Sequence, residues 1–446
     1  MPPHPDPLPE GEGKFPSIEI RNAACLATPL GRSARRGRSQ GEILRLRGAA
    51  LRAENGRLVF VGAEKDYARQ YAGRPAEVTL EATGKTLLPG FVDAHTHPVW
   101  AGDRGEEIGR RLAGESYARI AAEGGGILAT VRETRAASDG ELREAVARRL
   151  SRMLAHGTTT AEAKSGYGLT ADEELRALRL LASLSETAAD RNPLTPTRRP
   201  LAVPRLVPTL LAAHEVPPEF RGRRAEWVRI IAEEIVPRAA RENLARFCDV
   251  FCEEGVFTVP ESRAILEAAR RAGLSLRIHA DELSLSGGTL LAAELNASSA
   301  DHLLQIGERE IAALARADTV AVILPGTAWW IRSPPAPARA LIEAGVPVAV
   351  ASDANPGTCN TESLPAVAAH ACLDSNLTAE EALTGMTLNA AASLGLASET
   401  GSLEAGKSAD VAVLDAPDDR HLFYHWGANL VSAVILRGRV VVNMQQ

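Results

Sequence analysis

The sequence predicts an α/β protein: a (β/α)₈ TIM-like barrel with a small β-sandwich domain built from both chain ends. Three observations lead to this fold. Strand-like runs alternate with helical patterns through the middle of the chain, polar residues stand where those runs end, and both chain ends are rich in β-type stretches. We expect a disordered tract over residues 1–16, the sandwich domain over 17–86 and 396–446, and the barrel over 87–395.

The N-terminal tract is rich in proline and glycine, which favours disorder and excludes the helical apolar core of a signal peptide. Beyond it, β-forming runs predict strands near both ends of the chain, at residues 42–46, 57–61, 410–414, 432–436 and 439–442. Because two similar β-rich ends surround a different middle, we expect them to assemble into one small domain.

The middle of the chain carries eight strand-like runs, and helical patterns such as 139–154 and 260–272 separate most of them. The runs end near His97, Lys164, His214, Glu253, His279, His302, Pro325 and Asp353. Barrels of alternating strands and helices build their active sites at the carboxyl ends of the strands. We therefore expect the polar residues that end these runs to form one site.

The composition is that of a soluble globular protein, with 45% hydrophobic and 24% charged residues. A net charge of −6 gives no reason to expect nucleic acid or an anionic membrane as a partner. The five cysteines are sparse and scattered, which favours a reducing cytoplasm over a disulfide framework. Cys248 and Cys252 flank a strand-like segment without a second pair, so we interpret them as buried small side chains rather than metal ligands. The oligomeric state stays open, a homodimer included.

The first run ends in two histidines one residue apart, His95 and His97. Alternate residues of a strand point to the same face, so both imidazoles can bind one metal ion. Taken alone the pair is weak evidence, because a core histidine is often only hydrogen-bonded. The later runs strengthen it: His279 ends the fifth and Asp353 the eighth. Three imidazoles and one carboxylate suit zinc or iron and leave a position for water.

Two further residues stand where they can move protons. Glu282 follows His279 by three residues, and His302 ends the sixth run. A transition metal lowers the pKa of bound water toward about 7, so we expect Glu282 to take and redeliver a proton. His302 would orient the water or stabilise the developing oxyanion. A helix cap or a core hydrogen bond is the alternative for His302, and a solvated rim charge is the alternative for Glu282.

This pattern resembles the amidohydrolase superfamily, in its branch with a single metal, and the likeness runs from about Ile18 to Val442. The stretches that carry it are 89–97 (PGFVDAHTH), 124–132 (GGGILATVR), 162–169 (EAKSGYGL), 279–282 (HADE), 299–303 (SADHL) and 353–358 (DANPGT). The glycine-rich and Lys-Ser-Gly-Tyr-Gly segments are more specific than the metal residues, which many deaminases and cyclic amidases share.

The resemblance implies a role for each matching position. The implied metal ligands are His95, His97, His279 and Asp353, with Asp353 also counted as catalytic beside Glu282 and His302. The implied substrate contacts are Arg104, Tyr117, Tyr167, His214, Glu282, Asn355, Gly357 and Thr358. An arginine fork suits a carboxylate, and backbone amides around Gly357 could form an anion-binding concavity. A surface ion pair for Arg104 and simple packing for Tyr167 remain the alternatives.

The reaction that the resemblance implies is metal-dependent hydrolysis of the ring amide of 4-imidazolone-5-propanoate to N-formimidoyl-L-glutamate in histidine catabolism. A deaminase of a nitrogen heterocycle such as guanine or cytosine is the alternative with the same ligands. A non-catalytic metal-binding barrel is the third, but its site would be closed to water. Two segments depart from the pattern. Residues 191–200 look like a loop insertion far from the metal, and Cys359-Asn360 replaces an expected Ser-Pro type sequence after Thr358.

Overall fold

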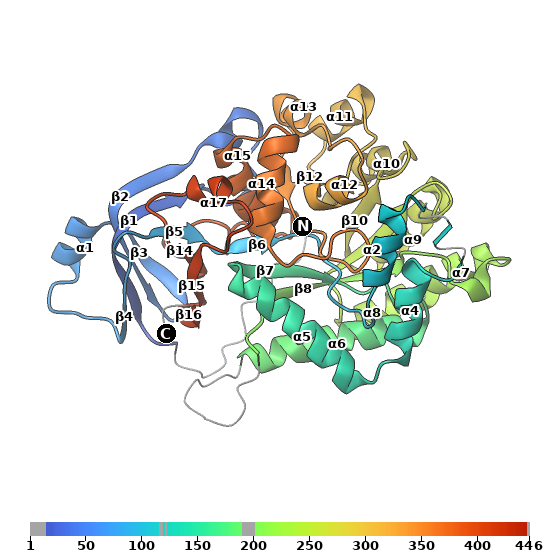
Figure 1. Ribbon diagram of the computed structural model, residues 1–446, viewed down its shortest axis with the longest axis horizontal. Coiled ribbons are helices and arrows are strands. Elements are labelled where there is room, and N and C mark those ends of the chain that lie inside the picture. Colours follow the sequence, from blue (N-terminus) through green and yellow to red (C-terminus); the bar gives the residue numbers. More distant parts are fainter. Residues whose placement is uncertain (1–14, 116–118, 121–122, 190–200, 444–446) are drawn as a thin grey trace.

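The computed structural model describes residues 15–115, 119–120, 123–189 and 201–443. Most of the predicted disordered tract, the stretch 191–200 and Tyr117 lie outside these ranges. Within them the chain forms two eight-stranded sheets, one entirely parallel and one mixed (Figure 1). The expected architecture, a parallel barrel with a separate sheet from both chain ends, is confirmed.

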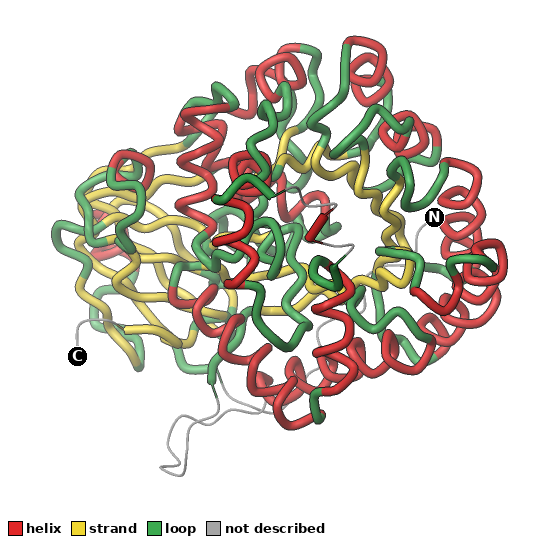
Figure 2. Tube along the Cα trace, turned by 45° about the vertical axis from the view of Figure 1, so that its right-hand side comes forward, coloured by secondary structure: helices red, strands yellow, loops and turns green. Residues whose placement is uncertain are grey.

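The parallel sheet is the barrel, and its strands pair in sequence order from β6 to β13. They are β6 (Phe91–Asp93), β7 (Thr158–Lys164), β8 (Arg205–Ala213), β9 (Phe247–Cys252), β10 (Ser275–Ala280), β11 (Ser299–His302), β12 (Val320–Ile323) and β13 (Val348–Val350). The ring closes just beyond the ends of the first and last strands. There the Asp353 amide donates to the His95 carbonyl and the His97 amide to the Ala354 carbonyl, both at 3.0 Å. Figure 2 shows this ring of strands with helices around it.

Helices cover the outside of the ring and connect its strands. The longer ones are α2 (Gly105–Leu112), α4 (Ile127–Ala136), α5 (Asp139–Ala155), α6 (Ala171–Ala189), α9 (Val259–Arg271), α11 (Glu308–Ala315) and α14 (Leu364–Asp374). The shorter ones are α7 (Arg224–Ile230), α8 (Val236–Arg241), α10 (Gly288–Glu294), α12 (Pro325–Trp330), α13 (Ala338–Glu343), α15 (Ala379–Thr384) and α16 (Ala390–Ser393). Capping boxes begin α5 at Ser138 and α9 at Thr258, because each hydroxyl is followed three residues later by a glutamate.

The two faces of the barrel strands differ in chemistry. On β10, Ile278 and Ala280 belong to the hydrophobic core shared with the helices, whereas Arg277 and His279 point the other way. On β7, Ala163 belongs to the same core, and Lys164 next to it is fully buried among charged groups. The outer faces therefore hold the helices by apolar packing, and the inner faces carry the polar groups of the site.

The mixed sheet draws strands from both chain ends. It comprises β1 (Ile18–Thr28), β2 (Leu44–Glu54), β3 (Arg57–Ala63), β4 (Val78–Glu81), β5 (Thr86–Pro89), β14 (Val411–Leu414), β15 (Val431–Leu436) and β16 (Arg439–Asn443). Its order is β16-β15-β14-β5-β1-β2-β3, with β4 beside β1. One hydrophobic core joins its two halves, with Ile20 and Leu51 from the N-terminal part and Val411 and Ile435 from the C-terminal part. The short helix α1 (Glu64–Gln70) packs on β2 and β3 of this sheet, and α17 (His421–Tyr424), between β14 and β15, packs on α14.

The character of the helices and the burial of the cysteines can be compared with what the composition predicts. Among the described residues, no helix combines the length and apolar character that crossing a bilayer requires. All five cysteines are free, and Cys248 and Cys252 are buried on β9 as expected.

Candidate active site

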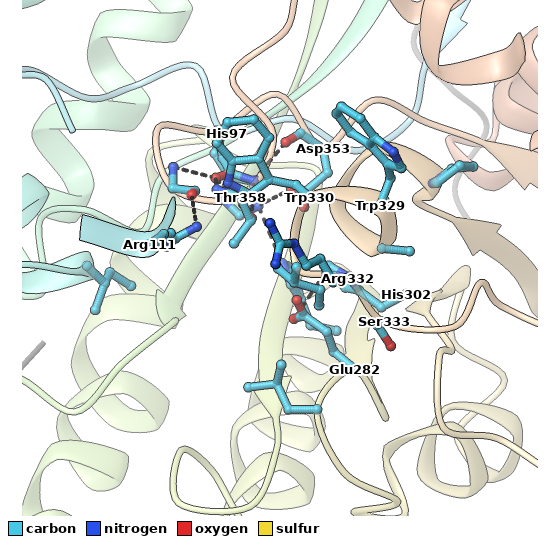
Figure 3. A pocket seen from close by; sticks show the side chains of 18 of the residues that line it. His97, Arg111, Glu282, His302, Trp329, Trp330, Arg332, Ser333, Asp353 and Thr358 are labelled. Atoms are coloured by element: carbon cyan, nitrogen blue, oxygen red, sulfur yellow. Dashed lines mark hydrogen bonds and ion pairs between the residues drawn. The ribbon is translucent and has the colours of Figure 1, made fainter. Parts of the chain in front are cut away.

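A cavity of about 1390 Å³ opens at the carboxyl ends of the barrel strands. Its lining includes His97, His279, Glu282, His302 and Asp353, which come from or directly follow strands β6, β10, β11 and β13. The cavity lining thus includes most of the polar residues that end the predicted runs, but not Lys164 or Glu253. Figure 3 shows this cavity, with His97 and Asp353 on one side and Glu282 and His302 on another.

Three imidazoles and one carboxylate meet at the floor of the cavity. The Nε2 atom of His97 lies 3.2 Å from that of His95 and 3.4 Å from that of His279. The Oδ1 atom of Asp353 lies 3.4 Å from the His97 Nε2 atom and 3.5 Å from the His95 Nε2 atom. All four side chains are buried, and the three histidines form a cluster with the geometry of a metal site.

The four residues fit a transition-metal ion by their chemistry as well as their spacing. Separations of 3.2–3.5 Å are those between neighbouring ligands of an ion with bonds of about 2.0–2.2 Å. Asp353 Oδ1 is buried without a hydrogen-bond partner, while its other oxygen accepts from the Thr327 hydroxyl at 2.5 Å. Burial, reinforced by neighbouring cations and imidazoles, holds the pKa of His95 and His97 well below the usual range, so both rings are neutral, as a metal requires.

The backbone at this rim is strained in a way that serves the site. Asp353 and His302, the residues at the ends of the last and sixth strands, have φ angles of 53° and 77°. This left-handed region is uncommon for residues other than glycine, and such strain concentrates at functional sites. Here it turns the chain sharply as each strand ends, where Asp353 meets the histidines of the first strand.

Glu282 and His302 form a pair beside the ligand cluster. The His302 Nε2 atom lies 3.6 Å from the Glu282 Oε2 atom. Burial, together with the negative charges of Asp353 and Glu253, raises the pKa of Glu282 well above its usual range. Glu253 accepts hydrogen bonds from the Glu282 and Leu283 amides at 3.1 and 2.9 Å and so fixes the backbone of this segment. Burial also lowers the pKa of His302 to about 3, which keeps it neutral.

The Lys-Ser-Gly-Tyr-Gly segment (164–168) leads from the end of β7 into the lining of the cavity, and a buried carboxylate holds its backbone by hydrogen bonds. Glu174 accepts hydrogen bonds from the amides of Gly166, Gly168 and Leu169 at 2.7–2.9 Å. Gly168 must lack a side chain, because a Cβ there would lie 2.7 Å from the backbone of Glu173. This support presents Tyr167 to the cavity.

His214 lies between the loop and His97. Its Nδ1 atom lies 2.9 Å from the Gly166 carbonyl, so the proton sits on Nδ1 and Nε2 remains an acceptor. Its ring stacks on that of His97, with centroids 5.2 Å apart, and Tyr167 meets it edge-on at 5.3 Å. Burial lowers the pKa of His214 well below the usual range, as expected among several imidazoles.

Arg104 and the loop 355–358 form one cluster at another part of the lining. The Asn355 Oδ1 atom accepts from the amides of Gly357 and Thr358 at 2.7 and 2.8 Å, which shapes the loop. A Cβ on Gly357 would lie 2.4 Å from the Arg104 Nη1 atom, so this close approach requires glycine. Arg104 also pairs with Glu107 at 2.8 Å. Arg104 and this loop are far apart in the sequence, and the fold brings them together in the lining of one cavity.

Sequence reasoning named part of this lining and missed other residues of it. Arg111 also reaches the loop, where its Nη1 atom donates to the Gly357 carbonyl at 3.2 Å. It stands seven residues after Arg104, a helical spacing that could have revealed it. Trp330 and Arg332 line the cavity as well, and Figure 3 shows the Arg332 guanidinium directed into it. Both residues follow β12, and Pro325 was the only residue expected at the end of that strand.

Comparison with known proteins gives consistent results. The family model described as Amidohydrolase family matches residues 86–441. The chain is 48% identical over 426 residues to an imidazolonepropionase from Symbiobacterium thermophilum, covering 95% of this chain and 97% of that protein. It is 45% identical over 391 residues to an imidazolonepropionase from Geobacillus kaustophilus, covering 87% and 89%.

Solved structures with a similar fold are more distant in sequence. An adenosine deaminase from Xanthomonas campestris with bound zinc has a TM-score of 0.66 at 19% identity, covering 96% of this chain and 93% of that one. A triazine hydrolase from Arthobacter aurescens has a TM-score of 0.68 at 16% identity, covering 97% and 96%. At these identities the likeness concerns the fold.

Proposed function

The chain belongs to the amidohydrolase family and within it to the imidazolonepropionases, and we infer that it hydrolyses the ring amide of 4-imidazolone-5-propanoate to N-formimidoyl-L-glutamate in histidine catabolism. The observation that carries this inference is the buried His95, His97 and His279 cluster with Glu282 at its side, in a chain nearly half identical to imidazolonepropionases over almost its whole length. The reaction adds water to the ring carbonyl carbon and breaks its bond to the ring nitrogen.

We propose that His95, His97, His279 and Asp353 hold one zinc or iron ion. Such an ion, when bound, would activate a water molecule and polarise the ring carbonyl. Asp353 supports this assignment because one of its oxygens is buried without a hydrogen-bond partner. Neutral imidazole rings and one carboxylate are acceptable to both metals, so the residues do not choose between them.

Glu282 is the proposed proton carrier. As a carboxylate it accepts a proton from the attacking water, and as an acid it delivers that proton to the ring nitrogen that leaves. Burial and the charges of Asp353 and Glu253 raise its pKa, which favours the protonated form that can donate to the leaving nitrogen. His302, 3.6 Å away and neutral, orients the reacting oxygen by a hydrogen bond. The carbonyl carbon of the ring becomes the α-carboxylate of the product.

The remaining lining residues bind and orient the substrate in this proposal. Arg104 takes the propionate carboxylate, and the Asn355, Gly357 and Thr358 loop receives a carboxylate end through its backbone and hydroxyl groups. Tyr167 and Tyr117 contact the ring. His214 accepts a hydrogen bond from a ring N–H of the substrate through Nε2, because its Nδ1 proton is donated to the Gly166 carbonyl.

A turnover assay tests the proposal against its alternative. The purified protein should consume 4-imidazolone-5-propanoate and form N-formimidoyl-L-glutamate without releasing ammonia. A deaminase with the same ligands would instead release one ammonia per turnover from a ring such as guanine or cytosine. Ammonia release from such a ring, with imidazolonepropanoate untouched, would overturn the assignment. We further propose that the reaction takes place in the cytoplasm, which the five free cysteines favour.

A further inference from the structure

Five charged side chains lie fully buried inside the barrel, directly beneath the proposed metal ligands. They are Glu162, Lys164, Asp249, Arg277 and Asp301, and each has an exposed fraction of 0%. They come from β7 and from the three neighbouring strands β9, β10 and β11, with β8 between the two groups. Charged groups are rarely buried so completely, because their removal from water is costly unless they are paired. We call this set the ionic chain.

The ionic chain is continuous across the barrel interior. Lys164 Nζ lies 2.7 Å from both Glu162 Oε1 and Asp249 Oδ2. Arg277 donates to Asp301 Oδ2 at 3.1 Å, and its Nε atom is 4.0 Å from Glu162 Oε1. Each cation therefore bridges two carboxylates, and Glu162 joins the two bridges.

Both ends of the ionic chain contact proposed metal ligands. At one end, Asp301 Oδ2 lies 2.7 Å from the Nδ1 atom of His95. At the other, Asp249 Oδ2 lies 3.0 Å from the Nδ1 atom of His279, a close charge contact outside hydrogen-bond geometry. The hydrogen bond to Asp301 keeps the proton of His95 on Nδ1, leaves its Nε2 free for a metal and fixes the plane of the ring.

The ionic chain also forms hydrogen bonds with the backbone on both sides of His95. Arg277 donates to the Ala94 carbonyl at 2.7 Å, and Glu162 Oε2 accepts from the Thr96 amide at 3.1 Å. Ala94 and Thr96 flank His95 in the sequence. The position of His95 is thus set both through its ring and through its backbone.

Three carboxylates and two cations give the ionic chain a net charge of −1, and Asp353 adds a further carboxylate beside the histidines. Loss of one buried cation would leave an uncompensated carboxylate next to a ligand, which is far more costly than loss of the whole pair.

We propose that Lys164 and Arg277 are positioning residues that hold His95 and His279 as one rigid unit, so that retention of the metal depends on the ionic chain. The proposal rests on the proposed function only in assuming that these histidines bind a metal. It concerns how long the ion stays bound, which can be measured without substrate.

The test is chelator-driven metal release from the loaded Lys164→Met variant. Methionine matches the length of the lysine but leaves Glu162 and Asp249 without their shared cation. We expect release to be about 10- to 100-fold faster than from the wild type, the range that loss of such supporting contacts typically produces.

The chain offers a matched control in Lys407, another buried lysine. It is 1% exposed, and its Nζ lies 2.6 Å from the Gly31 and Ala397 carbonyls and the Ser402 hydroxyl, away from the cavity lining. Lys407→Met should lower the thermal midpoint and leave metal release unchanged. Equal acceleration in both variants, or none in Lys164→Met, would overturn the proposal, because either result would mean that the ionic chain has no specific link to the ion.

A milder variant covers the case in which Lys164→Met does not fold. Arg277→Lys keeps the charge but cannot span Asp301 and the Ala94 carbonyl together. With Co²⁺ as the probe ion, its visible spectrum should shift because the His95 ring is held differently, and release should accelerate. An unchanged spectrum and release rate would count against the proposal. If metal behaves as expected but imidazolonepropanoate is not consumed, the proposed reaction fails while this inference stands.

Discussion

At the scale of single residues, the environment of Glu282 decides whether it can carry a proton. The side chain is buried, lies 3.6 Å from His302 and is close to two other carboxylates. Glu282→Gln keeps the shape but cannot exchange a proton, so we expect the variant to bind metal normally and to lose turnover by about 10²–10⁴-fold. Steady-state kinetics with metal analysis checks this, with the exposed Glu254→Gln as the control. If the Glu282→Gln variant kept most of the wild-type kcat, Glu282 would not be the proton carrier, and His302 or bulk water would have to transfer the proton.

The pKa of Glu282 also predicts a pH dependence. Burial raises the pKa of this carboxyl first, and the charges of Asp353 and Glu253 add to it. Since the carboxylate form must accept the proton, kcat/KM should fall as the pH drops through this raised pKa. Glu253→Gln removes one of the charges, so the acidic limb of the pH profile should move to lower pH. A limb at the same pH in wild type and variant would show that a different group controls it.

Arg104 is expected to bind a carboxylate remote from the bond that breaks. Such binding is equal in the substrate and the transition state, so Arg104→Ala should raise KM far more than it lowers kcat. A lost charge-assisted hydrogen bond corresponds to about 1.5–3 kcal/mol. A substrate analogue without the propionate should bind wild type and variant almost equally. Strong discrimination by that analogue would transfer the role to the 355–358 loop.

The positions of the proposed ligands in the fold could be predicted from the sequence because each stands at or just after the end of a strand-like run, as His279 and Asp353 do. Their supporting residues could not. Asp249 and Asp301 lie within strands, and a single sequence does not reveal which side chains face each other across a barrel. The buried Lys164 was visible as the end of a run, but its partner Asp249 is 85 positions away. Such contacts follow from strand order and register, which only the folded chain supplies.

At the scale of elements, the loop after β7 shows how one buried side chain supports several functional ones. Glu174 → Ala would leave three buried amides without acceptors, each at a cost of about 1–3 kcal/mol. We expect a lower thermal midpoint and a higher KM, since Tyr167 loses its support, with metal content unchanged. The adjacent Glu173→Ala removes only an ion pair with Arg176 and serves as the control. Similar KM values in the two variants would contradict this account of the loop.

Element boundaries were predictable where a local signal marks them. The helices expected at 139–154 and 260–272 are observed at Asp139–Ala155 and Val259–Arg271, because capping boxes fix where they begin. The first strand was harder to delimit. Asn22 has a φ of 58° and the pairing with β2 shifts between Ile20 and Ala23, so the alternation that identifies a strand is interrupted.

At the scale of the whole molecule, the site should hold one metal ion. A second ion would need further side chains that are free to bind it. Lys164, at the end of β7, pairs with carboxylates of the ionic chain, and Glu253, after β9, accepts hydrogen bonds from backbone amides. Elemental analysis should therefore give one zinc or iron per chain. Removal of the ion should lower the thermal midpoint, because a ligand bound only to the folded state stabilises it by mass action. Two ions at full occupancy, both bound by barrel residues, would contradict this.

The barrel and the two-ended sheet were predictable because both depend on patterns spread along the chain. The extent of the small sheet was less so. β5 continues to Pro89, past the expected limit at residue 86, since Thr86 to Pro89 pair with β14. A local apolar run does not say whether its partner lies nearby or at the other end of the chain. The order of β5 between β1 and β14 is a property of the completed fold.

The closing seam of the barrel has a consequence for biosynthesis. The ribosome makes the first metal-binding segment early and the last one, with Asp353, only after most of the chain has emerged. The Asp353 amide bonds to the His95 carbonyl, so ring closure and completion of the ligand set are the same event. A nascent chain that ends before β13 carries all three histidines but lacks the aspartate and the contacts that align it. The proposed set of four ligands is therefore complete only once the chain has been made through Asp353 and the seam has closed.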